Sequence, residues 1–126
     1  MPACHEITLE FKQKVLAWLE TLRDPNGPVW KYRMTKNSDA TVYNSCFALY
    51  ILNLFRSVDQ LKDGQKEEWI TYLQGFQNPQ TGLYCDPEAG SRVTDPTHDT
   101  RHLDLQLTNF CLSALSVFDK TSVYPL

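Results

Sequence analysis

The residues of this chain that could do chemistry are concentrated in one short segment, His98-Asp99-Thr100-Arg101-His102. His98 and His102 are four residues apart, so on a helix their side chains would share one face. An imidazole titrates near neutral pH and could transfer a proton, oriented by a carboxylate such as Asp86 or Asp104. The pattern predicts a catalytic group, and its candidate members are His102, His98, Asp99 and Asp86.

The same segment permits two other interpretations. With Cys85 or Asp86 from the preceding loop, the two histidines could form a zinc site. Alternatively, Thr97 or Asp99 caps a helix, and the polar side chains of His102 and Gln106 are only hydrogen-bonded. No CxxC pair is present, which excludes a zinc ribbon. We expect no metal and no cofactor, with zinc bound by Cys85, His98 and His102 as the alternative.

A second candidate group combines aromatic and basic side chains. The segment Trp30-Lys31-Tyr32-Arg33 alternates the two types. Aromatic faces suit sugar rings or apolar ligands, and cations suit carboxylates or phosphates. The alternative is a loop that folds Trp30 back over the first helix. The residues expected to contact a ligand are Arg101, Trp30, Tyr32, Arg33, Tyr84 and Gln106.

Helices must position these groups, because four segments repeat apolar residues at intervals of three and four. We expect helices from Ile7 to about Leu22, from Ser38 to Ser57, from Gly64 to Gln77 and from Thr97 to Phe118. Ser38 or Asp39 is the predicted N-cap of the second helix. The sequence thus predicts an all-α fold with four main helices. The aromatic residues expected in its core are Trp18, Trp69, Phe47 and Phe110.

The second half of the chain resembles the first. Leu19 to Gly27 matches Leu73 to Gly82, and Cys46 to Phe55 matches Asn109 to Phe118. The offset grows from 54 residues (Leu19 to Leu73) to 63 residues (Cys46 to Asn109), so the second loop is longer. This repeat predicts a single domain, 1–126, of two tandem helical hairpins, about 5–58 and 62–119. In each hairpin an amphipathic outer helix precedes an apolar inner helix.

The segment Leu73-Gln74 to Gly82-Leu83-Tyr84 resembles the end of an outer helix in α/α-toroid proteins. Terpene cyclases, protein prenyltransferase β-subunits and six-hairpin glycosidases share that architecture. The resemblance implies a lipid-linked, prenyl or carbohydrate substrate at the loop end of the hairpins. The acidic DxDD-type cluster of the cyclases is missing here. Toroids close with more hairpins than two, so we expect self-association, another helical partner or a longer chain.

Composition excludes several classes of function. The 126 residues contain 12 Lys+Arg and 15 Asp+Glu, a net charge of −3 without a clustered basic face, which argues against nucleic-acid binding. No apolar run reaches the ~18 residues of a membrane-spanning helix. The first residues lack the basic and apolar regions of a secretion signal, so we expect a cytoplasmic protein.

The sequence leaves two functions open, and it does not decide whether the chain is an enzyme. The first is binding of a small polar, carbohydrate or lipid-linked ligand near the N-termini of the inner helices, possibly in part of a toroid enzyme. The second is a non-catalytic protein–protein interaction module that uses the exposed flank of a hairpin.

Overall fold

The computed structural model describes residues 8–87 and 101–125, and these residues form helices but no β-strand. The α-helices are α1 (Leu9–Thr21), α2 (Val42–Leu54), α3 (Asp63–Gln74) and α5 (Arg101–Val117). A short 3₁₀ helix, η1 (Val58–Gln60), joins α2 to α3. The all-α fold with four main helices is confirmed.

Threonine side chains begin the first two helices. The Thr8 hydroxyl accepts a hydrogen bond from the amide of Phe11 at 3.1 Å, and the Thr41 hydroxyl accepts one from Asn44 at 3.2 Å. Each bond satisfies an amide that the first helical turn leaves unpaired. The prediction of Ser38 or Asp39 as the cap of α2 is wrong, because the Ser38 hydroxyl bonds the preceding turn at Thr35 instead.

The inner helices α2 and α5 end in the same way. Arg56 and Asp119 have left-handed φ angles of 58° and 57°, and they are 63 positions apart. The next amide in each case bonds back to the helix, from Ser57 to Leu52 at 2.7 Å and from Lys120 to Leu115 at 3.1 Å. This is the Schellman arrangement that satisfies the last carbonyls of a helix.

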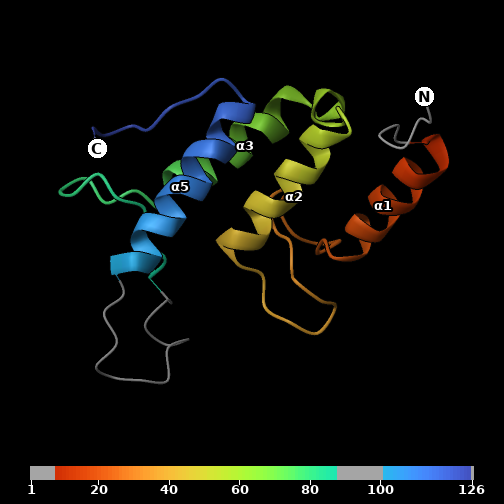
Figure 1. Ribbon diagram of the computed structural model, residues 1–126, viewed down its shortest axis with the longest axis horizontal. Coiled ribbons are helices and arrows are strands. Elements are labelled where there is room, and N and C mark those ends of the chain that lie inside the picture. The colour runs from red at the N-terminus through yellow and green to blue at the C-terminus, as the bar shows by residue number, and fades with distance from the viewer. Residues whose placement is uncertain (1–7, 88–100, 126) are drawn as a thin grey trace, which may run out of the picture.

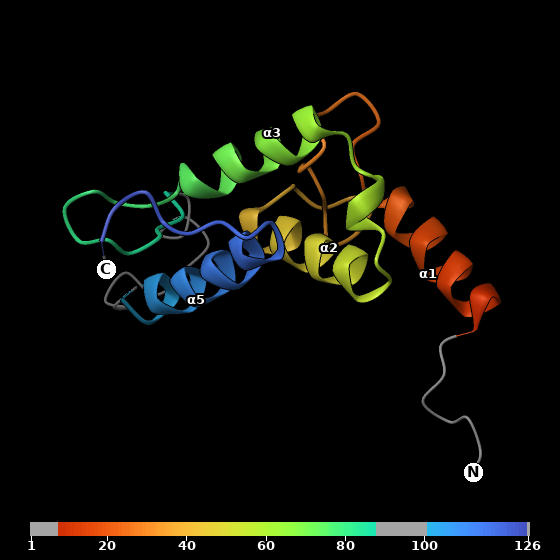
Figure 2. The ribbon, with the colours of Figure 1, turned by 90° about the horizontal axis from the view of Figure 1, so that it is seen from above.

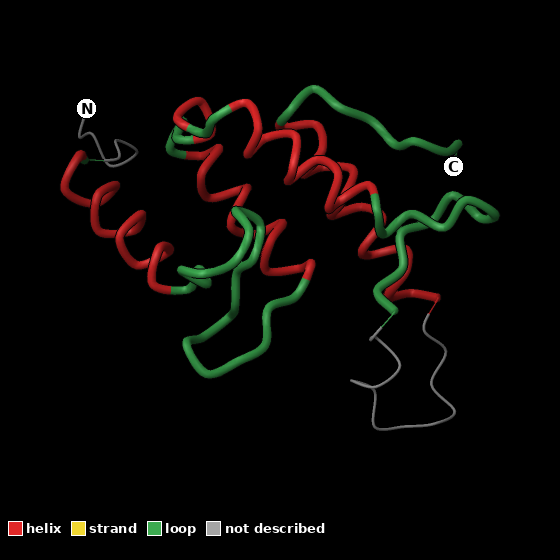
Figure 3. Tube along the Cα trace, turned by 180° about the vertical axis from the view of Figure 1, so that it is seen from behind, coloured by secondary structure: helices red, strands yellow, loops and turns green. Residues whose placement is uncertain are grey.

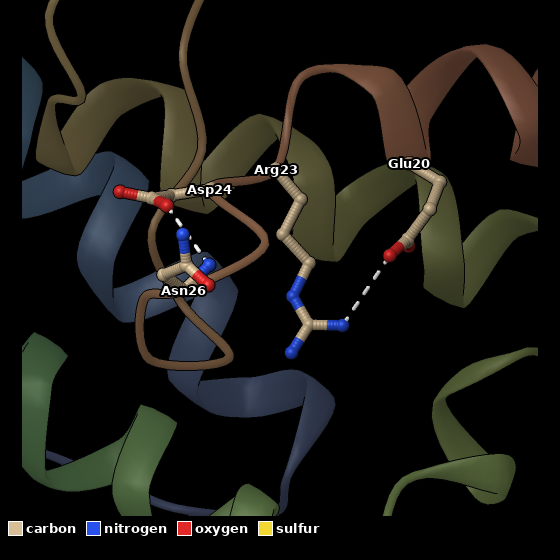
Figure 4. Close-up of polar contacts among 4 residues, drawn as sticks. All are labelled: Glu20, Arg23, Asp24 and Asn26. Carbon is tan, nitrogen blue, oxygen red and sulfur yellow. Dashed lines mark hydrogen bonds and ion pairs between the residues drawn. The ribbon is translucent and has the colours of Figure 1, made fainter.

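The turns that follow α1 and α3 also share one hydrogen-bond pattern. Asp24 accepts from the amide of Asn26 (Figure 4), and Asn78 accepts from the amide of Gln80, each in an Asx turn. After each turn the chain runs back to form an isolated antiparallel bridge. The first bridge pairs Arg23 with Tyr32, and the second pairs Gln77 with Tyr84. Tyr32 therefore corresponds to Tyr84, and the second turn is two residues shorter.

Helices α2 and α5 lie side by side and run in the same direction, and α3 crosses one side of this pair in the opposite direction (Figures 1 and 2). Small side chains let α2 and α5 approach closely, since Cys46 and Cys111 are both fully buried. Trp69 of α3 is also fully buried and donates from Nε1 to the Ser45 hydroxyl at 2.8 Å. These contacts form the core, whereas α1 extends away from it (Figure 2).

The C-terminal segment is tied to the end of α3. The buried side chain of Gln77 donates to the carbonyl of Tyr124 at 2.8 Å and accepts from its amide at 3.0 Å. The hydroxyls of Tyr84 and Ser122 are 2.8 Å apart. The tube in Figure 3 shows this segment as a loop that continues from α5 without further helix.

Two aromatic residues expected in the core are not there. Trp18 is 54% exposed and Phe47 is 37% exposed, so the prediction of their burial is wrong. Trp69 is fully buried and Phe110 is packed against the core, as expected. Trp18 and Phe47 are exposed because no element of the described chain covers the side of α1 and α2 on which they lie.

Candidate functional site

The N-terminal ends of α2 and α5 lie at the same end of the molecule, together with the loop that precedes α2 (Figure 1). This loop end was the predicted ligand site. Trp30 and Asp86 lie together there, lining a shallow depression of about 240 Å³ beside Thr41 and Val42. Its size is below the ~300–1,000 Å³ typical of pockets for small molecules.

The Trp30 ring is already engaged by another aromatic side chain. It stacks on Tyr72 of α3, with ring centroids 3.6 Å apart and an angle of 4° between the planes. One face of the indole is therefore covered by protein. The loop folds Trp30 over a helix, although that helix is α3 and not α1, the first helix of the alternative interpretation.

Two predicted contact residues are in the core instead of the site. Tyr32 is buried and stacks on Trp69 with ring centroids 5.9 Å apart, and Tyr84 is fully buried. Burial, and secondly the charge of Glu20, raises the pKa of Tyr32 to about 12. Burial likewise raises the pKa of Tyr84. Neither side chain presents a face to a ligand in solution.

The predicted catalytic group falls only partly within the described residues. His98 and Asp99 lie outside them, and of Arg101 only the backbone, at the start of α5, is described. His102 and Gln106 are exposed on α5, and the residues lining the depression at Asp86 do not include His102. The alternative zinc site includes His98, so it also lies partly outside the described residues. Residues 8–87 and 101–125 contain no group of three or more His, Cys, Asp or Glu that could hold a metal ion.

Comparison of the chain with known protein families, curated proteins and solved structures gave no match in any of the three searches. The resemblance to α/α-toroids therefore stays a prediction, as does catalysis by the histidines. In the described part of the chain, no helix is long and apolar enough to cross a membrane.

The thiol of Cys85 provides a direct probe of the loop end. Burial and the negative charge of Asp104 raise its pKa. In a Cys4→Ser background, we expect iodoacetamide to alkylate Cys85 with a pH midpoint above that of a free thiol, because only the thiolate reacts. Asp104→Asn should lower this midpoint, since it removes the like charge. The buried Cys46 and Cys111 should stay unreactive until urea unfolds the chain. A midpoint that Asp104→Asn leaves unchanged would exclude the carboxylate as a cause.

Exposed apolar side chains gather elsewhere, on what we call the α1–α2 flank. It consists of large side chains of the two helices and of the loop between them, Phe11, Trp18, Met34, Phe47 and Leu54, each 37–65% exposed. Phe11 and Trp18 are seven residues apart on α1, and Phe47 and Leu54 are seven apart on α2, so each pair shares one helix face. Trp18, Met34 and Phe47 line a common groove, with Leu22, Ala48 and Arg33 at its floor and edge.

The groove on the α1–α2 flank corresponds to a surface that is covered in the second hairpin. By the sequence alignment, Trp18 and Leu22 match Tyr72 of α3 and Phe76 just after it. Phe47 and Ala48 match Phe110 and Cys111 of α5. All four residues of the second hairpin pack against the core, so only the first hairpin lacks a neighbour on this side.

The first hairpin supplies that cover with a specific set of side chains. Trp30 stacks on Tyr72, and Cys46 packs against Cys111. The hydrogen bond with Cys46, together with burial, raises the pKa of the Cys111 thiol. The Phe110 ring meets Tyr43 and Phe47 with centroids 5.8 and 5.4 Å away. The hydroxyl of Tyr50 donates to the carbonyl of Phe110 at 2.6 Å.

The opposite flank of the molecule is polar. The bridges that align Tyr32 with Tyr84 place Gly82 at the position of Trp30. At the offset of 63 residues, Tyr43, Cys46 and Tyr50 match Gln106, Asn109 and Ser113. The last three are exposed on α5, and Leu105 is the one large apolar side chain exposed on that helix. In repeat proteins a polar outer face is typical of a terminal unit. Sequence periodicity could not distinguish the two flanks, because it locates an apolar face without showing what covers it.

Proposed function

We propose that this chain is a non-catalytic interaction module that docks onto a helical protein surface through the α1–α2 flank. The observation that supports this function is the groove between Trp18, Met34 and Phe47, whose equivalent in the second hairpin is a packed interface. Protein–protein contact through this flank was the alternative function read from the sequence. It is favoured over a ligand site because the loop-end depression is small and its Trp30 ring is stacked on Tyr72.

The size of the flank is consistent with docking. Its five large apolar side chains expose roughly 500 Å², if each spans about 150–250 Å² in full. A stable interface buries about 800 Å² on each partner, so these side chains would provide more than half of one side. Monomeric proteins seldom expose a larger apolar patch.

Sedimentation velocity over a series of protein concentrations tests self-association through this surface. If a second copy occupies the flank, the wild-type chain associates, and Trp18→Glu or Phe47→Glu should each weaken association at least tenfold, because a buried charge in an apolar contact is costly. Leu105→Glu on the opposite flank is the matched control, since it also replaces an exposed apolar side chain, and it should have no effect.

If the wild-type chain stays monomeric, a second measurement tests for a different partner. A photo-crosslinker at position 18 should then capture one protein from extract of the source cells, and Phe47→Glu should abolish that capture. If the chain neither associates with itself nor gives a cross-link that depends on Phe47, the flank is not a docking surface and the proposal is rejected.

A further inference from the structure

The α1–α2 flank has a defined shape and chemistry, and these indicate which kind of partner fits it. We infer that its occupant is another helical hairpin that carries the same contact face as the first hairpin of this chain. The partner's turn would place an aromatic ring on Trp18, as Trp30 does on Tyr72. Its inner helix would place two tyrosines beside Phe47, as Tyr43 and Tyr50 do beside Phe110. This inference rests on the proposed docking function and names the partner.

The start positions of the helices support this placement. The N-cap residues of α1 and α3 are Thr8 and Lys62, and their difference of 54 equals the sequence offset of the repeat. Helices α1 and α3 therefore begin at matching positions, and their turns have matching hydrogen bonds. A hairpin placed before α1 in the way that the first hairpin precedes α3 would reach Trp18 in register.

Trp18 and Val15 show what such a partner would cover. Val15 matches Trp69 of α3, which is fully buried under α2 and bonded to Ser45. Trp18 and Val15 lie three positions apart on α1, on the side that continues to Phe11 and Leu22. The partner's inner helix would lie along this stripe, as α2 lies against Trp69 of α3.

Charge complementarity points to an acceptor group on the partner. Arg33 is the only charged residue that lines the groove, and its guanidinium donates from Nη1 to the carbonyl of Lys36 at 3.2 Å. A positive charge at the groove favours a carboxylate or carbonyl on the partner. The partner face therefore combines aromatic rings with an acceptor near Arg33.

A second copy of this chain cannot provide that face in a head-to-tail contact. In each copy the contact face of the first hairpin is already covered by the second hairpin. The second hairpin exposes Gln106, Asn109 and Ser113 at the matching positions of its inner helix and has Gly82 in place of Trp30, so it lacks the aromatic rings. Head-to-tail growth into a ring or filament is therefore disfavoured.

A chain lengthened by one hairpin tests the inference directly. Residues 8–62 are placed before residues 9–126, so that the added hairpin leads into α1 in the register that leads into α3. Gln13→Glu in the added copy gives its first helix a different mass. Hydrogen exchange followed by mass spectrometry then reports on the original α1. We expect its amides to exchange at least tenfold more slowly than in the unlengthened chain, because helix opening would expose the new contact.

The matched control is the same lengthened chain with Trp30→Gly, Tyr43→Gln and Tyr50→Ser in the added copy, the residue types that the second hairpin has at these positions. The control should slow exchange of α1 by no more than twofold. Equal protection of α1 in both lengthened chains, or no protection in either, overturns the inference. If the unlengthened chain protects α1 through self-association that Trp18→Glu abolishes, the occupant is a second copy. That result would overturn the hairpin partner but leave the docking function standing.

Discussion

Replacing Trp69 with alanine should lower the free energy of unfolding by about 4 kcal/mol, the range found for large aromatic residues in protein cores. The Trp69 side chain is fully buried, stacks on Tyr32 and approaches Phe118 at 6.3 Å. Its removal would leave a cavity among α2, α3 and the first turn, and would leave the buried hydroxyl of Ser45 without its donor. Urea unfolding followed by circular dichroism measures the loss.

Trp18→Ala is the control for this experiment, because it removes the same side chain from an exposed position of α1. It should cost less than about 1 kcal/mol in a monomeric chain, as surface substitutions usually do. Trp69→Phe separates packing from hydrogen bonding, and its cost should fall near 1–2 kcal/mol. Similar losses for Trp18→Ala and Trp69→Ala would contradict the placement of Trp18 outside the core.

Replacing Gln77 with methionine should lower the free energy of unfolding by about 2–3 kcal/mol and release the C-terminal segment. The buried amide of Gln77 makes three hydrogen bonds, one to the carbonyl of Gly82 and two to Tyr124. Methionine has a similar shape but leaves two carbonyls and one amide unpaired. The Tyr124 amide, which donates to Gln77 in the wild-type chain, should then exchange its hydrogen faster, because the segment is no longer held against α3.

Gln74→Met provides the comparison, since Gln74 also bonds the C-terminal segment but makes one exposed hydrogen bond, to the carbonyl of Thr121. Its effect should stay below about 1 kcal/mol, with little change in the rate of hydrogen exchange at the Tyr124 amide. If the two substitutions have equal effects, burial of the Gln77 amide is not what holds the segment.

The two flanks of the molecule bear on the toroid resemblance. A toroid unit needs a neighbour on both sides, whereas this chain has one apolar flank and one polar flank. An asymmetric pair of this kind suits a terminal position in an array of hairpins. A role for this chain at the end of such an array therefore remains a proposal, tested by the lengthened chain.

Local chemistry explains which parts of the fold could be predicted. The helices were located to within a few residues, because apolar periodicity and turn residues such as Asp24 and Pro25 act within the segment itself. The cap of α2 was misplaced by two or three residues, since Ser38, Asp39 and Thr41 all offer a suitable oxygen. Only the geometry of the turn, in which Ser38 already bonds Thr35, decides among them.

The sequence by itself determined the number and type of the elements and the match between the two halves, because periodicity and turn chemistry depend on near neighbours in the chain. The tertiary structure decided which of the matching positions are covered. Trp18 and Tyr72 have the same place in their helices, yet Trp30 stacks only on Tyr72. Burial depends on what lies across the interface, and no aromatic ring among the described residues stacks on Trp18 as Trp30 does on Tyr72.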